Sequence, residues 1–316
     1  MKRIGAVLCL IICISCKISV DNPIKRNEIS IDQVKEHVEF LTSDALQGRN
    51  TGTTGIEMAA RYIENVFTKN NIKPYFETFR DTFNIKDIVG YNIVGIIEGN
   101  DPKLKDEYVI IGAHYDHIGF KTKVDNDSIA NGANDNAAGT TAVLALAKYL
   151  AKEKMNKRSI IIALFSGEEL GLVGSEHLAE KLNKRNLNLY TMLNFEMIGV
   201  PFKDRDYEAF VTGYDLSNMA QVMNNSIGSN YIGRSEVAIR YNLFKQSDNY
   251  AFYQVFRVPS QTISSCDLSN YDYYHHVDDE ADKLDYEHMT KLINKMIPAI
   301  QNICNSATKE IKMTHE

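Results

Sequence analysis

The feature that most constrains the fold of this chain is a set of largely apolar runs without regular polar alternation. These runs are Tyr91–Ile97, Tyr108–Ile111, Ser159–Phe165 and Tyr190–Phe195. A strand with one face in water alternates apolar and polar residues, whereas a strand covered on both faces does not. Stretches with the helical spacing of apolar residues lie between the runs. This pattern predicts a three-layer α/β/α fold with a mostly parallel central sheet.

Further elements extend this prediction. Val34, Val38 and Leu41 have helical spacing, and Ser30 or Asp32 before them can cap a helix. More helices are expected at residues 56–70, 137–152, 173–182, 216–225 and 286–305, and more strands at residues 209–212 and 258–263. The chain has 316 residues, of which 44% are hydrophobic, and no internal repeat, so one domain over residues 30–306 is the simplest account. A tether, residues 17–29, precedes the domain, and we expect the polar tail, residues 307–316, to be frayed.

The first residues have the layout of a secretory signal. Lys2 and Arg3 precede an apolar run, residues 4–14, that is too short to span a bilayer, which takes about 20 apolar residues. Ser15 and Cys16 follow the run, and Cys16 in this place resembles the lipidated cysteine of bacterial lipoproteins. The resemblance implies a signal peptide over residues 1–16 and an exported protein, periplasmic or at the cell surface, whose lipid on Cys16 anchors it to a membrane. Cys13 stands where leucine is usual, and an ordinary cleaved signal is the alternative.

The charge of the chain bears on nucleic-acid binding, and its cysteine content bears on disulfide formation. The formal net charge is −6, with 35 basic and 41 acidic residues, and no basic run indicates a nucleic-acid partner. Only Cys266 and Cys304 lie outside the signal, and we expect two buried, unpaired thiols.

Three consecutive buried strands end in imidazoles or carboxylates. His114, Asp116 and His117 follow the strand at 108–112, Glu168 and Glu169 follow the strand at 159–165, and Glu196 follows the strand at 190–195. In open α/β sheets, ligands bind beyond the carboxyl ends of the strands. Uncompensated charge at such a crevice is costly, so this placement indicates a functional site.

Two further segments carry residues of the same chemical type. Asp135 lies in the small-residue loop 132–139, and His275 lies in an aromatic loop followed by Asp278 and Asp279. Nitrogen and carboxylate ligands without thiolates suit zinc. One histidine per ion and a shared carboxylate would place two ions about 3.5–4 Å apart, where they can bind a bridging hydroxide and polarise a carbonyl oxygen. Of the adjacent residues Glu168 and Glu169, one can ligate while the other acts as a base.

Five segments resemble the M28 family of zinc aminopeptidases, in the family's order. They are residues 112–117 (GAHYDH), 132–139 (GANDNAAG), 165–171 (FSGEELG), 194–199 (NFEMIG) and 274–279 (YHHVDD). The resemblance implies the zinc-dependent exopeptidase fold and two Zn²⁺ ions per chain. It also implies that Asp135 bridges both ions, that His275 and Glu169 complete one site, and that His114 and Glu196 complete the other.

The resemblance assigns further roles, and the chain departs from the family in places. It implies that Glu168 is the general base and that Asp116 orients His114. Many relatives carry Asp where this chain has Glu196, so we expect a shifted metal site rather than a lost one. Asn249 stands where relatives often have His and should affect the pocket. Tyr241 is a weak candidate for the tyrosine that some relatives use to stabilise the oxyanion.

The function implied by the resemblance is hydrolysis of peptide substrates at their N-terminus. A carboxypeptidase could use the same metal ligands, and a glutaminyl cyclase shares the fold but binds one zinc ion. A non-enzymatic peptide-binding protein on the same fold is a further alternative. His117 is expected either to support the metal ligands from behind or to lie in the pocket wall, and side-chain preference is expected to depend on loops between residues 200 and 269.

Overall fold

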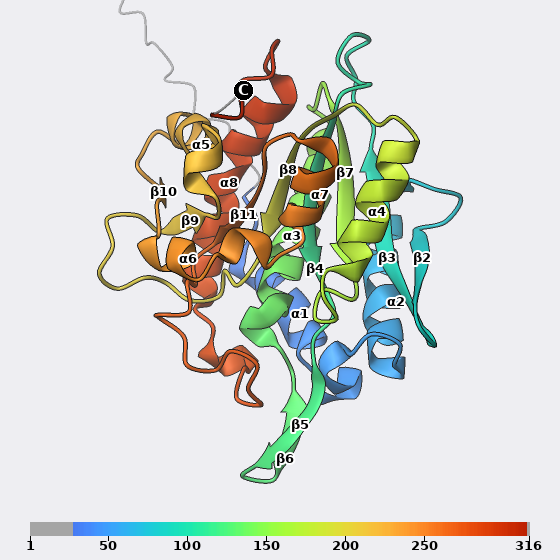
Figure 1. Cartoon of the computed structure of the whole chain (residues 1–316), viewed down its shortest axis with the longest axis vertical. Helices are drawn as coiled ribbons and strands as arrows, with labels where there is room; N and C mark the ends of the chain where they lie inside the picture. The colour runs from blue at the N-terminus through green and yellow to red at the C-terminus, as the bar shows by residue number, and fades with distance from the viewer. Residues whose placement is uncertain (1–27, 315–316) are drawn as a thin grey trace, which may run out of the picture.

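The computed structural model describes residues 28–314, and within them helices cover both faces of one sheet (Figure 1). The signal peptide and Cys16 lie outside the described residues. The sheet has nine strands in the order β1-β3-β7-β4-β8-β11-β9-β10, and β2 also pairs with β3. This arrangement is the predicted three-layer α/β/α fold.

The strands of this sheet are β1 (Lys73–Pro74), β2 (Arg80–Ile85), β3 (Ile88–Ile97), β4 (Tyr108–His114), β7 (Ser159–Phe165), β8 (Leu189–Phe195), β9 (Ala209–Val211), β10 (Ile232–Gly233) and β11 (Ser260–Ser264). A separate hairpin consists of β5 (Gly119–Val124) and β6 (Asp127–Ala130). The helices are α1 (Ile31–Leu41), α2 (Thr54–Lys69), α3 (Ala138–Glu153), α4 (Val173–Lys184), α5 (Met219–Ile227), α6 (Glu236–Arg240), α7 (Asn249–Phe256) and α8 (Tyr286–Asn305).

The centre of the sheet is parallel, and this brings the strand ends together. β7, β4, β8 and β11 pair in parallel, whereas β3 pairs with β7 in the antiparallel sense. The register sets His114 beside Phe165 and Gly112 beside Asn194. Every residue of β7 and β8 is buried, as the missing alternation predicts. The residues that follow β4, β7 and β8 therefore emerge at one edge.

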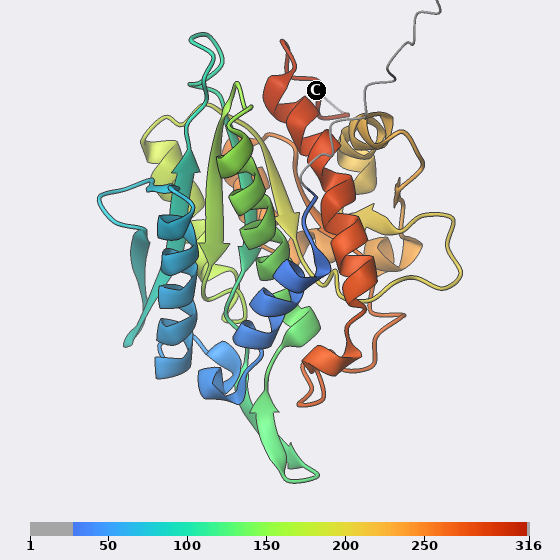
Figure 2. The same ribbon diagram turned by 180° about the vertical axis from the view of Figure 1, so that it is seen from behind.

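The two faces of the sheet are covered by different helices. Helices α4 and α7 pack on the face seen in Figure 1, and α1, α2, α3 and α8 cover the opposite face, seen in Figure 2. Helix α3 follows directly on the loop that carries Asp135 and is almost wholly buried. The larger core thus lies beneath that loop.

Most predicted elements agree with the structure, and the disagreements have local causes. β7 and α8 have the predicted bounds, and Ser30 caps α1 in a capping box with Gln33. The predicted helix at 216–225 begins only at Met219, because a 3₁₀ turn, Tyr214–Leu216, precedes it.

The expectation of a frayed tail is wrong for the residues up to Thr314. The Ile311 side chain is 2% exposed, and its backbone N–H donates to the Tyr190 hydroxyl at 2.8 Å. Met313 forms an antiparallel bridge with Ser217. Cys266 and Cys304 are buried and unpaired, as expected. Within residues 28–314 the structure has no helix with the length and apolar character needed to cross a membrane.

Candidate metal centre

Polar side chains from five segments meet at the carboxyl edge of the sheet. They are His114 at the end of β4, Asp135 in the turn before α3, Glu168 and Glu169 after β7, Glu196 after β8, and His275 in the loop between β11 and α8. The structure therefore brings together all five predicted metal ligands and the predicted base.

These side chains form two groups with the spacing of metal ligands. The ligand atoms within each group lie within 4.8 Å of one another, and the groups are His114, Glu168 and Glu196, and His117, Asp135 and Glu169. The adjacent residues Glu168 and Glu169 thus belong to different groups, which suits two different roles.

Asp135 belongs to the second group and also faces His114 of the first. Its Oδ1 is 3.4 Å from His114 Nε2, and its Oδ2 is 3.2 Å from His275 Nε2. His275 Nε2 also lies 3.0 Å from Oε2 of Glu169. One carboxylate therefore presents a separate oxygen to each of the two predicted sites.

Asp279 holds the backbone that leads into this carboxylate. Its Oδ1 accepts from the Asn134 N–H at 2.7 Å, and its Oδ2 accepts from the Asp135 N–H at 3.0 Å. The Tyr271 hydroxyl donates to Asp279 Oδ1 at 2.5 Å. The loop before α8 thus fixes the position of Asp135.

Asn136 links the Asp135 turn to the segment that carries Glu196. Its Nδ2 donates to the Phe195 carbonyl at 3.0 Å, and its Oδ1 accepts from the Met197 N–H at 3.2 Å. Both bonds flank Glu196, whose carboxylate also accepts from the Ser247 hydroxyl. The Glu196 side chain is thereby held at the centre.

The Asp116 carboxylate contacts the turn that carries the two glutamates more closely than it contacts His114. Its oxygens accept from the backbone N–H groups of Glu168 at 3.3 Å and Glu169 at 3.4 Å, and from the Thr51 hydroxyl at 3.1 Å. Its carboxylate is 3.7 Å from His114 Nδ1, while its backbone carbonyl is 3.2 Å from the same atom. Asp116 is placed to orient both segments.

A buried arginine ties together the segments that carry the ligands. The Arg49 side chain is fully buried and donates to the carbonyls of Leu41, Tyr115, Asn131 and Gly132 at 2.5 to 3.0 Å. Tyr115 is next to His114, and Gly132 begins the Asp135 turn. These contacts make the loop that carries Arg49 a structural turn.

The electrostatics of the centre are those of a site for cations. Burial raises the pKa of Glu196 to about 7 and the pKa of Glu168 well above its usual range, and neighbouring carboxylates add to both shifts. Burial alone would lower the pKa of His114, but the charges of Glu168 and Asp135 raise it well above its usual value. His114 Nε2 is buried without a hydrogen-bond partner. Buried carboxylates that outnumber their partners are stabilised by bound metal ions.

The same segments match a known sequence family. A sequence model described as Peptidase family M28 matches residues 92–300, a stretch that contains every residue of the two groups. The chain belongs to peptidase family M28.

Relatives within the M28 family carry zinc-peptidase names. A probable zinc metalloprotease of Pyrenophora teres f. teres is 30% identical over 193 residues, which is 57% of this chain and 39% of that protein. The aligned part spans 36 to 40% of the length of three such curated relatives.

Solved structures share the fold over nearly their whole length. The zinc aminopeptidase BSAP from Bacillus subtilis has a TM-score of 0.70 at 14% identity, with 90% of this chain and 98% of that chain covered. A glutaminyl cyclase from Fimbriiglobus ruber has a TM-score of 0.70 at 18% identity, with 88% and 97% covered. The fold is therefore common to both kinds of enzyme.

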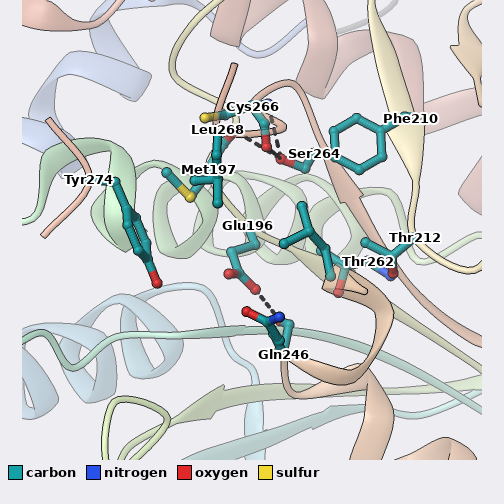
Figure 3. A pocket seen from close by; sticks show the side chains of 12 residues that line it. Glu196, Met197, Phe210, Thr212, Gln246, Thr262, Ser264, Cys266, Leu268 and Tyr274 are labelled. Atoms are coloured by element: carbon teal, nitrogen blue, oxygen red, sulfur yellow. Dashed lines mark hydrogen bonds between the residues drawn. The ribbon is translucent and has the colours of Figure 1, made fainter. Parts of the chain in front are cut away.

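A pocket opens beside Glu196 (Figure 3). Its lining consists mainly of apolar and hydroxyl side chains, among them Met197, Phe210, Leu268 and Thr262. Most of the lining comes from residues 210–268, as the sequence analysis expected. Asn249, expected to affect the pocket, does not line it; it accepts a hydrogen bond from the lining residue Thr262 at 2.7 Å.

Tyr274, and not the candidate Tyr241, is the tyrosine that lies beside the metal centre. Tyr241 is 53% exposed at the end of α6, and it is not among the residues that line the pocket. Tyr274 lines the pocket, stacks on the His275 ring at 4.0 Å, and extends toward the same space as the Glu196 carboxylate (Figure 3). It is therefore the better-placed tyrosine to contact a substrate.

Sequence reasoning missed four residues of this region or gave them a lesser role. They are Arg49, His117, Tyr274 and Asp279. Tyr274 and Asp279 lie within the family motif at 274–279, so a place near the metal centre could have been predicted for both. The roles of Arg49 and His117 depend on contacts between distant segments, which no local pattern predicts.

Proposed function

We propose that this chain is an extracytoplasmic exopeptidase that uses two zinc ions to remove residues from the N-terminus of peptides. The observation that supports this most directly is the Asp135 carboxylate, which offers one oxygen toward His114 and the other toward His275. A shared carboxylate of this kind is what a two-metal hydrolytic site requires.

The residues present fit zinc. Each proposed site has one of these two histidines and at least one further carboxylate, Glu196 or Glu169, with no thiolate. Zinc bound there would polarise the peptide carbonyl and make a water molecule easier to deprotonate at neutral pH.

Glu168 is the proposed general base. Its carboxylate lies within ligand distance of His114 and Glu196, next to the space where the attacking water would bind. Glu168 takes the proton from the attacking water and passes it to the amide nitrogen as the C–N bond breaks. Tyr274 is proposed to donate a hydrogen bond to the carbonyl oxygen as negative charge develops there.

The residues beside the centre favour the amino end of a peptide over the carboxyl end. Of the described residues that line the adjacent pocket, none is Lys or Arg. A carboxypeptidase needs such a cation for the substrate carboxylate, whereas the buried Arg49 is fully engaged with backbone carbonyls.

The pocket beside Glu196 is proposed to receive the side chain of the N-terminal residue. Met197, Phe210 and Leu268 give it an apolar wall, so an apolar side chain gains free energy by leaving water there. We therefore expect leucine-like and methionine-like residues to be preferred over charged ones.

The deciding experiment combines metal analysis with four versions of one leucyl peptide. The versions have a free or acetylated N-terminus and a free or amidated C-terminus. An aminopeptidase with two zinc ions per chain should lose activity on acetylation only. Loss on amidation would indicate a carboxypeptidase, whereas one zinc ion and release of ammonia from a glutaminyl peptide would indicate a cyclase. Peptide binding without turnover would favour the non-enzymatic alternative.

The proposed location rests on the first residues of the sequence. Lys2, Arg3 and the apolar run at 4–14 favour export, and Ser15-Cys16 favours a lipid on Cys16. Peptides outside the cytoplasm would then be the substrates.

A further inference from the structure

His117 is a buried imidazole at the centre that the proposed ligand set leaves without a function. Its Nδ1 lies 2.8 Å from Glu169 Oε1 and 3.8 Å from Asp135 Oδ2, the same oxygen that faces His275. Its side chain is 0% exposed, and its Nε2 is buried without a hydrogen-bond partner. We propose that His117 is a fourth protein ligand of the metal site formed by Asp135, Glu169 and His275. This inference rests on the two-metal centre proposed above.

The distances between the polar atoms lie on both sides of the edge length of a tetrahedral zinc site, three of them shorter and one longer. With zinc–nitrogen and zinc–oxygen bonds of about 2.0–2.2 Å, two ligands of a tetrahedron lie about 3.3–3.6 Å apart. The four edges that join an imidazole of His117 or His275 to a carboxylate of Asp135 or Glu169 measure 2.8, 3.0, 3.2 and 3.8 Å. The two rings meet edge to face, with centroids 5.7 Å apart, so both can direct a nitrogen to the same point.

The surroundings of His117 hold its ring in this orientation. Gly132 packs against the imidazole so closely that a Cβ at this position would lie 2.5 Å from two atoms of the ring. The backbone N–H of His117 donates to the carbonyl of Arg49 at 3.3 Å and holds the main chain at this residue. The close packing on Gly132 restricts rotation of the ring, whose Nδ1 faces the two carboxylates.

With a fourth protein ligand at one site, the two metal sites differ in how many coordination positions the protein fills. Zinc sites with four protein ligands are closed, whereas catalytic sites have three and keep one position open. The site of His117, Asp135, Glu169 and His275 is therefore the closed one, and the site of His114, Asp135 and Glu196 is the open one. It follows that a chelator removes the ion of the His114 site first, and that a single remaining ion is bound next to His117.

The simpler alternative is that His117 only donates a hydrogen bond to Glu169. Loss of such an orienting contact typically weakens metal binding by about 10–100-fold. Loss of a ligand should weaken the affinity of the closed site by more than about 100-fold. Loss of a ligand should also lower the number of imidazoles bound to metal, whereas loss of a hydrogen bond leaves that number unchanged.

The experiment uses the full chain loaded with two cobalt(II) ions. Proton NMR then counts the hyperfine-shifted, exchangeable imidazole N–H signals, one for each bound histidine. The wild type should show three, and His117→Ala should show two and lose affinity for one ion in a chelator competition. His276→Ala removes a neighbouring imidazole that is 42% exposed, and it should keep three signals and wild-type affinity.

The wild-type count tests the inference even if His117→Ala does not fold. Two signals in a wild type with two bound ions would overturn the fourth ligand and leave the proposed function intact. Three signals retained in a folded His117→Ala variant would overturn it as well. A wild type that binds fewer than two ions would contradict the proposed function itself.

Discussion

At the scale of single residues, the sharpest test separates the two adjacent glutamates. Glu168 faces His114 and Glu196, whereas Glu169 lies 3.0 Å from His275 Nε2. Glu168→Gln keeps the size of the side chain and removes the basic oxygen, so we expect kcat to fall about 10²–10⁴-fold with both ions retained. Glu169→Gln should lose zinc together with activity.

The measurement is metal content and kcat on the same preparations of both variants. If Glu168→Gln loses zinc and Glu169→Gln keeps it, Glu168 is the ligand and the two roles are exchanged. This outcome has a structural basis, because the Glu168 carboxylate lies within ligand distance of His114 and Glu196. Near-normal kcat in Glu168→Gln would contradict the hydrolytic mechanism.

A second residue-scale prediction concerns the tyrosine that contacts the substrate carbonyl. Tyr274→Phe removes the hydroxyl and keeps the ring that stacks on His275. Loss of one oxyanion donor typically costs about 10²–10³-fold in kcat, and we expect KM to change little. Tyr241→Phe is the matched control, because Tyr241 is 53% exposed, and it should leave both constants unchanged. A larger effect at Tyr241 than at Tyr274 would reverse the assignment.

At the scale of elements, Arg49 is expected to hold the ligand-bearing segments in register. Arg49→Met leaves four buried carbonyls without their donor, and each orphaned group costs about 1–3 kcal/mol. We expect the free energy of unfolding to fall by more than about 3 kcal/mol in urea denaturation followed by circular dichroism. Arg61→Met removes an exposed pair with Glu57 and should cost less than about 0.5 kcal/mol. Equal losses in the two variants would contradict the role given to Arg49.

The loop after β11 contributes a wall of the pocket beside Glu196, and the next prediction is a change of specificity there. Leu268→Glu places a carboxylate in the wall of the pocket beside Glu196. We expect kcat/KM for lysyl substrates to rise about tenfold relative to leucyl substrates. The lysyl ammonium group would gain a carboxylate partner in the pocket, and the leucyl side chain would lose an apolar contact. Met155→Glu adds the same charge at a residue that is 58% exposed and should leave the ratio unchanged. An unchanged ratio in Leu268→Glu would mean that the substrate side chain lies elsewhere.

Three elements of the structure show which parts of the fold can be predicted from the sequence. β7 is buried along its whole length, so its apolar run gives its bounds to the residue. The hairpin of β5 and β6 was missed because most of β5, Gly119–Val124, is exposed, so no buried apolar run marks it. The packing of the tail through Ile311 was missed because it depends on Tyr190, which is distant in sequence.

At the scale of the whole molecule, the centre depends on more of the chain than the family match covers. The match begins at residue 92, yet Arg49 and Thr51 reach the centre from the segment before it. The ligands were predictable because each follows a buried strand or lies in a family motif. The supporting contacts of Arg49 and Asp279 were not, because they join segments more than 65 residues apart in most cases.

Attachment of the whole molecule to a membrane is the last prediction. Lys2, Arg3 and the apolar run at 4–14 end at Ser15-Cys16, which is the arrangement expected of a lipoprotein signal. Cys16→Ser removes the only thiol at the proposed attachment point, and Cys13→Ser makes the same change three residues earlier as a control. Fractionation and labelling with a palmitate analogue give the readout. A wild type that is soluble and unlabelled after lysis would mean that the segment is an ordinary cleaved signal. We expect the wild type and Cys13→Ser to be labelled and membrane-bound, and Cys16→Ser to lose the label and leave the membrane, because one side chain carries the acyl chains that hold the enzyme there.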